Sequence, residues 1–158
     1  MRSTNVSSAV NSGWFAAALQ ALMFLDQPGE GPCSSASLAD QVRAHAVSLR
    51  RIMAPLVRAG IVEAREGRDG GYRLARPLDR ITLADLYRAL SAVPTSEPHQ
   101  SEPSWSALLP AGTRLALDEV AAEAEARLLQ LLEQHTIASV AARAHALGSV
   151  HTAIAAGE

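Results

Sequence analysis

Arginine is the residue type whose number and spacing best fit a chemical task in this sequence. All 14 basic residues of the 158-residue chain are arginines, and ten of them lie between Arg43 and Arg88 together with five acidic residues. That segment has a formal net charge of +5, whereas residues 97–158 have −5. A guanidinium group donates paired hydrogen bonds to phosphate or to the edge of guanine. The basic segment is therefore suited to a polyanion, although the whole chain has a net charge of −2.

Other reactive residue types are sparse. Cys33 is the only cysteine, which excludes a disulfide scaffold and a four-thiolate metal site. Because residues 32–35 include no base or cation, we expect an ordinary thiol, with a redox bridge between subunits as the alternative. The five histidines show no metal-ligand spacing, and no nucleophile–base pair or phosphate-binding loop is found. The sequence thus predicts neither an enzyme nor a cofactor or metal site.

The arginines need elements that present them, and the periodicity predicts a helix-turn-helix. An apolar helix over residues 10–25, with Trp14 in the core, ends at a run rich in proline and glycine and is too short to span a membrane. Ser37 is predicted to cap a short second helix, with Asp40 three residues further on. A third helix covers residues 47–59 and stops at Gly60. Two short helices joined by a tight turn form the motif.

The third helix separates an apolar face from a basic one. The apolar stripe consists of Leu49, Ile52, Met53 and Leu56. The opposite face holds Val47, Arg51, Ala54 and Arg58, with Ser48 and Arg50 on its flanks. Pro55 is expected to kink or shorten the helix, so the face that enters a groove should be the first two turns.

A β-hairpin is predicted directly after this helix. Residues 61–65 and 72–76 alternate like strands, and a glycine-rich turn between them carries Arg68. A helix-turn-helix followed by a hairpin is a winged helix, so the fold class is mainly α with a small β-hairpin. Arg65, Arg73 and Arg76 either contact phosphates or pair with neighbouring acidic residues.

The second half of the chain predicts a linker and a long helix. Thr82 and Asp85 cap a helix that completes a DNA-binding domain over residues 1–91. Residues 92–112 are rich in proline without a period, which is typical of a linker. From Thr113 onward apolar residues recur in heptads, with a second, final helix over residues 136–147 and a frayed tail after it. The heptad seam comprises Leu117, Ala121, Ala124, Leu128, Leu131 and His135, widened by Leu115, Val120 and Leu132. This region, 113–158, is predicted to dimerise, with an ordinary amphipathic helix as the alternative.

The segment over residues 9–93 resembles the DNA-binding half of the Rrf-two (Rrf2) family of bacterial winged-helix regulators. The markers are Leu38-Ala39, Arg50-Arg51-Ile52, Leu56, Ala59-Gly60-Ile61-Val62, Gly70-Gly71-Tyr72 with Leu74, and Ile81-Thr82-Leu83. The resemblance implies a homodimer that binds near-palindromic operators and usually represses. Several members hold an iron–sulfur cluster on three cysteines before the dimer helix, but residues 92–112 contain none. The chain resembles the cluster-free branch, whose effectors are mostly undefined.

These observations predict a cytoplasmic, dimeric, sequence-specific transcriptional regulator of double-stranded DNA, acting as a repressor of nearby genes. An unknown small-molecule effector is compatible with this interpretation, and Trp105 would then line its pocket or cover the dimer helix. The alternative is a winged helix used as a protein-interaction module without sequence-specific DNA binding. The residues predicted to contact DNA are Ser37, Val47, Ser48, Arg50, Arg51, Arg58, Arg65 and Arg68.

Overall fold

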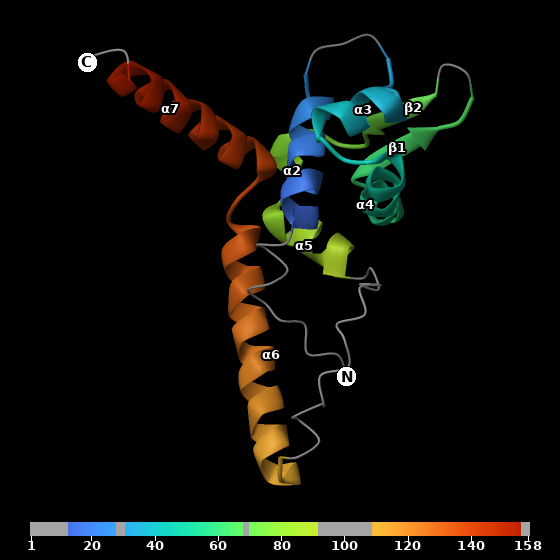
Figure 1. Ribbon diagram of the computed structural model, residues 1–158. Coiled ribbons are helices and arrows are strands. Elements are labelled where there is room, and N and C mark those ends of the chain that lie inside the picture. Colours follow the sequence, from blue (N-terminus) through green and yellow to red (C-terminus); the bar gives the residue numbers. More distant parts are fainter. Residues whose placement is uncertain (1–12, 28–30, 68–69, 92–108, 156–158) are drawn as a thin grey trace.

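The computed structural model of the protein describes residues 13–27, 31–67, 70–91 and 109–155, with side chains up to residue 147 (Figure 1). The mainly helical fold with one antiparallel hairpin confirms the predicted fold class. Its elements are α2 (Gly13–Leu25), α3 (Ser35–Gln41), α4 (Ala46–Arg58), β1 (Val62–Arg65), β2 (Gly71–Leu74), the 3-10 turn η1 (Leu78–Arg80), α5 (Leu83–Ser91), α6 (Ala111–Glu133) and α7 (Ile137–Ala155).

A single hydrophobic core joins α2, α3, α4 and α5. The predicted apolar stripe of α4 is confirmed, because Leu49, Ile52, Met53 and Leu56 are all buried. The expected shortening at Pro55 is wrong, since α4 continues through this residue to Arg58. Pro55 cannot donate a backbone hydrogen bond, but its ring is buried, and this apolar burial offsets part of the loss.

The cap predicted at Ser37 is wrong by one helical turn. Ser34 is the cap of α3, and its Oγ accepts a hydrogen bond from the backbone N–H of Ser37 at 3.1 Å. The helix begins earlier because Cys33 is held in extended conformation by backbone hydrogen bonds to Tyr72, of 2.9 and 2.8 Å. The cap at the start of α5 is confirmed, with reciprocal 3.1 Å hydrogen bonds between Thr82 and Asp85.

The predicted hairpin is present with shifted bounds, because β1 begins one residue later than predicted and β2 begins one residue earlier and ends two residues earlier. β1 and β2 pair with Val62 opposite Leu74 and Arg65 opposite Gly71. Cys33 adds a one-residue bridge to the outer side of β2, so the wing has a third extended segment beside it. Gly71 permits this close approach, because a Cβ at this position would lie 2.1 Å from the carbonyl oxygen of Cys33.

The C-terminal helices project from the winged-helix body but are anchored to its core (Figure 1). The backbone N–H of Leu83 donates to the carbonyl of His135, and that of Ile137 donates to the carbonyl of Ile81, each at 2.8 Å. Leu132 and Ile137 are buried in the same core as α2 to α5. The winged-helix core is therefore completed by residues of the last two helices, and Leu132, which heptad spacing placed in the widened seam, is buried in this core.

The bounds of α6 and α7 also differ from the prediction. Helix α6 begins at Ala111, inside the segment assigned to a linker, and α7 continues to Ala155 instead of ending near Leu147. Most of the predicted linker, residues 92–108, lies outside the described residues, as does Trp105.

Candidate nucleic-acid interface

The solvent face of α4 carries the side chains that the helical period assigned to it. Val47 is 69% exposed, and Arg50, Arg51 and Arg58 are exposed as well. Ser48 is half-buried on one flank of this face. These arginines lie on the second helix of the helix-turn-helix, which is the helix that enters the major groove in this motif.

The tight turn between α3 and α4 contains an arginine in the left-handed region. Arg43 has φ of +50°, and the turn closes through hydrogen bonds from Ala44 to the carbonyl of Ala39 and from Val42 to that of Leu38. Residues with a Cβ rarely adopt this conformation, and glycine or asparagine is the usual residue there. Because this position is an arginine, the sequence does not mark the turn. The exposed Arg43 extends the basic surface to the start of α4.

The guanidinium group of Arg51 lies over the indole ring of Trp14, 5.5 Å from its centroid. Trp14 is half-buried on α2, so it is not a fully buried core residue as the sequence predicts, and part of its ring is available to Arg51. At this distance a cation–π interaction restrains the guanidinium while its N–H groups remain available as donors. Sequence reasoning missed this contact, because the two residues lie on different helices and share no local pattern.

The wing contributes fewer free cations than its arginine count suggests. Arg73 pairs with Glu63, which stands opposite it in the hairpin. Arg76 pairs with Asp85 at 3.2 Å, which leaves Arg65 as the exposed wing arginine without an ion pair among the described residues. Arg68 lies outside those residues.

The distribution of ion pairs concentrates positive charge on α4. Among the described residues, Arg50, Arg51 and Arg58 have no carboxylate partner, whereas Arg88 of α5 pairs with Glu133 of α6. Ser37 is exposed on α3, beside this surface in the motif. The arrangement presents guanidinium donors and small side chains on one helix, which is suited to phosphates and base edges.

Helix α6 presents an apolar face with no cover in the described part of the chain. Leu117, Val120 and Leu131 are each more than half exposed on this face, and Ala121 and Ala124 between them are exposed too. Leu115 is also more than half exposed, but at about 100° per residue it lies on nearly the opposite side of the helix from Leu117. Leu128 is the exception within the predicted seam, because it is half-buried against the core of its own chain. His135 is exposed where α6 ends.

Tyr87 of α5 lies near Glu125, in the C-terminal half of α6. Its side chain is 2% exposed, and burial together with the negative charge of Glu125 raises the pKa of the phenol. The neutral phenol is thus the form that the folded protein favours.

Cys33 has the environment of a structural thiol. It is half-buried, forms no disulfide, and its Sγ donates a weak hydrogen bond of 3.6 Å to the carbonyl of Ser34. Over the described ranges, no three His, Cys, Asp or Glu side chains gather closely enough to hold a metal ion. None of the described helices is long and apolar enough to cross a membrane.

Comparison with known proteins agrees with this geometry. The model of the Rrf2 family, described as an iron-dependent transcriptional regulator, matches residues 12–143. YwgB of Bacillus subtilis, named as an HTH-type transcriptional regulator, is 27% identical over 124 residues, or 78% of each chain. The structure of T. potens IscR matches with a TM-score of 0.57 and 26% identity, covering 84% of this chain and 86% of the other. That of CymR, the global cysteine regulator of B. subtilis, matches with a TM-score of 0.52 and 26% identity, covering 84% and 95%.

Rrf2 proteins regulate transcription and are not enzymes. The family model extends from α2 through all of α6 and into the first part of α7, so it includes the helix-turn-helix, the wing and the anchored start of the C-terminal region. The winged-helix interpretation is confirmed by these matches. The chain belongs to the Rrf2 family of transcriptional regulators.

Proposed function

We propose that this chain is a homodimeric, sequence-specific DNA-binding regulator that represses genes near its operator. The observation that carries the proposal is the solvent face of α4, where three arginines have no carboxylate partner among the described residues. An arginine without an intramolecular ion pair does not have to break one before it binds DNA. Arg51 lies within this face and Arg50 on its flank, and both are proposed to contact base edges or phosphates in the major groove.

The surrounding residues complete the proposed contact surface. Val47 and Ser48 at the start of α4 face the groove walls, and Ser37 and Arg58 lie at its margins. Arg65 on β1, together with Arg68 in the turn, is proposed to contact the flanking phosphates or minor groove.

The apolar face of α6 supports the homodimer. Leu117, Ala121, Ala124 and Leu131 repeat at heptad spacing and are exposed in the single chain, so pairing with a second copy would remove them from water. A two-fold dimer would place its two α4 helices in successive major grooves, about 34 Å apart. A pseudo-palindromic operator follows from this symmetry. In the cytoplasm, a dimer bound to such an operator would block access to the neighbouring promoter.

Iron is not part of this proposal, although the family model carries an iron-dependent description. An iron–sulfur cluster needs several thiolates, and this chain has one cysteine, whose backbone is bound in the bridge to Tyr72. The donor set does not fit the group, so no step of the mechanism involves it.

The test is the double variant Arg50→Ala with Arg51→Ala. The operator would first be selected by the wild-type protein from a pool of randomised duplexes, and affinities measured by fluorescence anisotropy. Each good bidentate base contact contributes about 1–3 kcal/mol, so we expect the double variant to bind roughly a hundredfold more weakly. If these arginines bind phosphates instead, each substitution should reduce the log–log slope of affinity against salt concentration by about 0.9.

The matched control removes two other exposed arginines, Arg80→Ala with Arg143→Ala. It makes the same change in net charge on η1 and α7, away from α4. Both variants should remain dimers by analytical ultracentrifugation. Unchanged operator affinity in the α4 variant, or an equal loss in the control, would refute the proposed interface. Failure to select any preferred sequence would favour the protein-interaction alternative.

A further inference from the structure

Val47 is the only large hydrophobic residue of the winged-helix body that is exposed, among residues 13–27, 31–67 and 70–91. The other exposed large hydrophobic residues of the described chain lie on or beside α6 and α7, from Leu109 to Leu147. Val47 is 69% exposed and belongs to the first turn of α4, the helix proposed to enter the major groove. Because the described part of the chain leaves it largely uncovered, Val47 can still bury apolar surface when DNA is bound.

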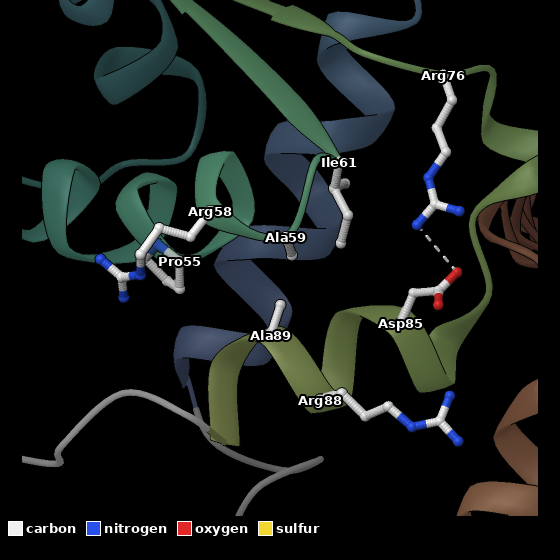
Figure 2. Close-up of a pocket in the computed structure, with 8 residues that line it drawn as sticks. All are labelled: Pro55, Arg58, Ala59, Ile61, Arg76, Asp85, Arg88 and Ala89. Carbon is white, nitrogen blue, oxygen red and sulfur yellow. Dashed lines mark ion pairs between the residues drawn. The ribbon is translucent and has the colours of Figure 1, made fainter.

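The helical period places Val47 on the same side of α4 as two arginines. At about 100° per residue, Val47, Arg51 and Arg58 lie within about 40° of one another around the helix axis. Figure 2 shows that Arg58, at the far end of α4, extends away from the ion pair between Arg76 and Asp85. Val47 is therefore the apolar end of a line of cationic side chains that have no carboxylate partner among the described residues.

Two restraints limit the positions of Val47 and Arg51. A valine in a helix has one strongly preferred χ1 rotamer, so little rotational entropy is lost when its methyl groups pack against DNA. The guanidinium of Arg51 is restrained by the indole ring of Trp14, 5.5 Å from its centroid. The two residues are one helical turn apart, which corresponds to about 6 Å along the helix axis. Since base pairs are stacked about 3.4 Å apart, these side chains can reach positions about two base pairs apart.

The chemistry of valine selects among the groups that line the major groove. Its side chain neither donates nor accepts a hydrogen bond, so it cannot bind a phosphate or replace water at a polar base edge. The 5-methyl group of thymine is the apolar group that the base pairs present in this groove. Contact between this methyl group and Val47 removes apolar surface of both from water. Cytosine, guanine or adenine at the same place would instead lose the hydration of a polar group without gaining a hydrogen bond.

We propose that Val47 is a specificity-determining residue that packs against the 5-methyl group of a thymine in each half-site of the operator. The thymine would lie within about two base pairs of the position that Arg51 contacts. This inference rests on the proposed function, because it requires α4 to enter the major groove of DNA. It adds the identity of a base, which arginines that bind phosphates do not specify.

Deoxyuridine is the probe, because it keeps the pairing and the polar groups of thymidine and lacks only the methyl group. The operator selected by the wild-type protein would be synthesised with deoxyuridine at one thymine of each half-site, for each thymine in turn. Fluorescence anisotropy would measure the affinity of the full chain for each duplex at one salt concentration. We expect one symmetric pair of replacements to weaken binding about fourfold per half-site, since about one methyl group is then no longer buried.

The variant Val47→Ala tests whether Val47 makes this contact. It should bind the thymine and deoxyuridine duplexes with affinities that differ by less than about twofold at that position. Leu147→Ala is the matched control, because Leu147 is 63% exposed on α7, which projects away from α4 in Figure 1. The control should keep the wild-type preference for thymine. The measurements on the wild type with deoxyuridine do not depend on the folding of any variant.

The outcomes separate this inference from the function on which it rests. Equal affinities of the wild type for all the duplexes, or an operator without a fixed thymine in its half-sites, would overturn the inference and leave the proposed function intact. A preference for thymine that persists in Val47→Ala would overturn it as well, because another residue would then contact the methyl group. If the wild type selects no preferred sequence from the randomised pool, the proposed function fails and the inference fails with it.

Discussion

Gly71 is where the wing and the segment before α3 approach most closely, and the substitution Gly71→Ala tests that approach. A Cβ at this position would lie 2.1 Å from the carbonyl oxygen and 2.6 Å from the carbonyl carbon of Cys33. The obstruction is backbone, so no side-chain rotation relieves it. The Cys33 segment would have to retreat by more than an ångström to reach an ordinary van der Waals distance, which breaks its hydrogen bonds to Tyr72 of 2.9 and 2.8 Å.

The expected loss of stability follows from these two effects. Two backbone hydrogen bonds contribute about 0.5–1.5 kcal/mol each to the net free energy of unfolding. The unfolded chain loses some freedom when glycine becomes alanine, which returns about 0.4–1 kcal/mol. The balance is a destabilisation of about 1–2 kcal/mol, consistent with the usual range for overpacking.

Urea unfolding followed by circular dichroism would measure this loss at a fixed protein concentration. With a slope of about 2 kcal/mol per molar urea, the midpoint should fall by roughly 0.5–1 M. Gly13→Ala is the matched control, since a Cβ there has no neighbour within 4 Å and lies in α2. If Gly71→Ala unfolds at the same midpoint as the control, the Cys33 segment moves without cost and the reasoning is refuted.

Three further changes probe interactions of other kinds. Trp14→Leu removes the ring beneath Arg51 and should weaken operator binding about two- to fivefold, with Trp14→Phe intermediate by anisotropy; equal affinities would show that the ring does not position the guanidinium. Thr82→Ala removes the hydroxyl that accepts a hydrogen bond from the backbone of Asp85 and should lower the free energy of unfolding by about 1 kcal/mol, whereas Thr82→Ser should retain it; similar urea midpoints for both variants would contradict a capping role. Because the pKa of Tyr87 is raised in the folded protein, this tyrosine should ionise first in the unfolded chain, above about pH 10. The free energy of unfolding, measured with urea, should therefore fall as the pH rises, and it should fall less in Tyr87→Phe. An equal fall in the wild type and in Tyr87→Phe would contradict this reasoning.

The winged helix was predictable because its signals are local. The apolar period of α4, the glycine after it and the alternating residues of the hairpin each lie within a few residues of the element they specify. The exact start of α3 was not predictable, because Ser34 becomes the cap only when Cys33 pairs with Tyr72, which is remote in sequence. The three serines near this helix start, Ser34, Ser35 and Ser37, look equivalent without that pairing.

The candidate site was predictable to the level of one helix face. The helical period of α4 assigned Arg51 to solvent, but nothing local indicated that Trp14 would lie under it. Heptad spacing likewise identifies an apolar face of α6 without specifying what covers it. Leu132 fits that spacing, yet it is covered by its own chain.

The paired hydrogen bonds that join Leu83 to His135 and Ile137 to Ile81 have a thermodynamic consequence. They tie the segment between α6 and α7 to the start of α5, while Leu132 completes the core there. The C-terminal end of α6 and the winged helix should therefore unfold as one cooperative unit. If α6 also joins two copies, mass action stabilises that unit, by about 1.4 kcal/mol per mole of dimer for each tenfold rise in protein concentration. Dilution would then lower the population of folded DNA-binding domains as well as that of dimers.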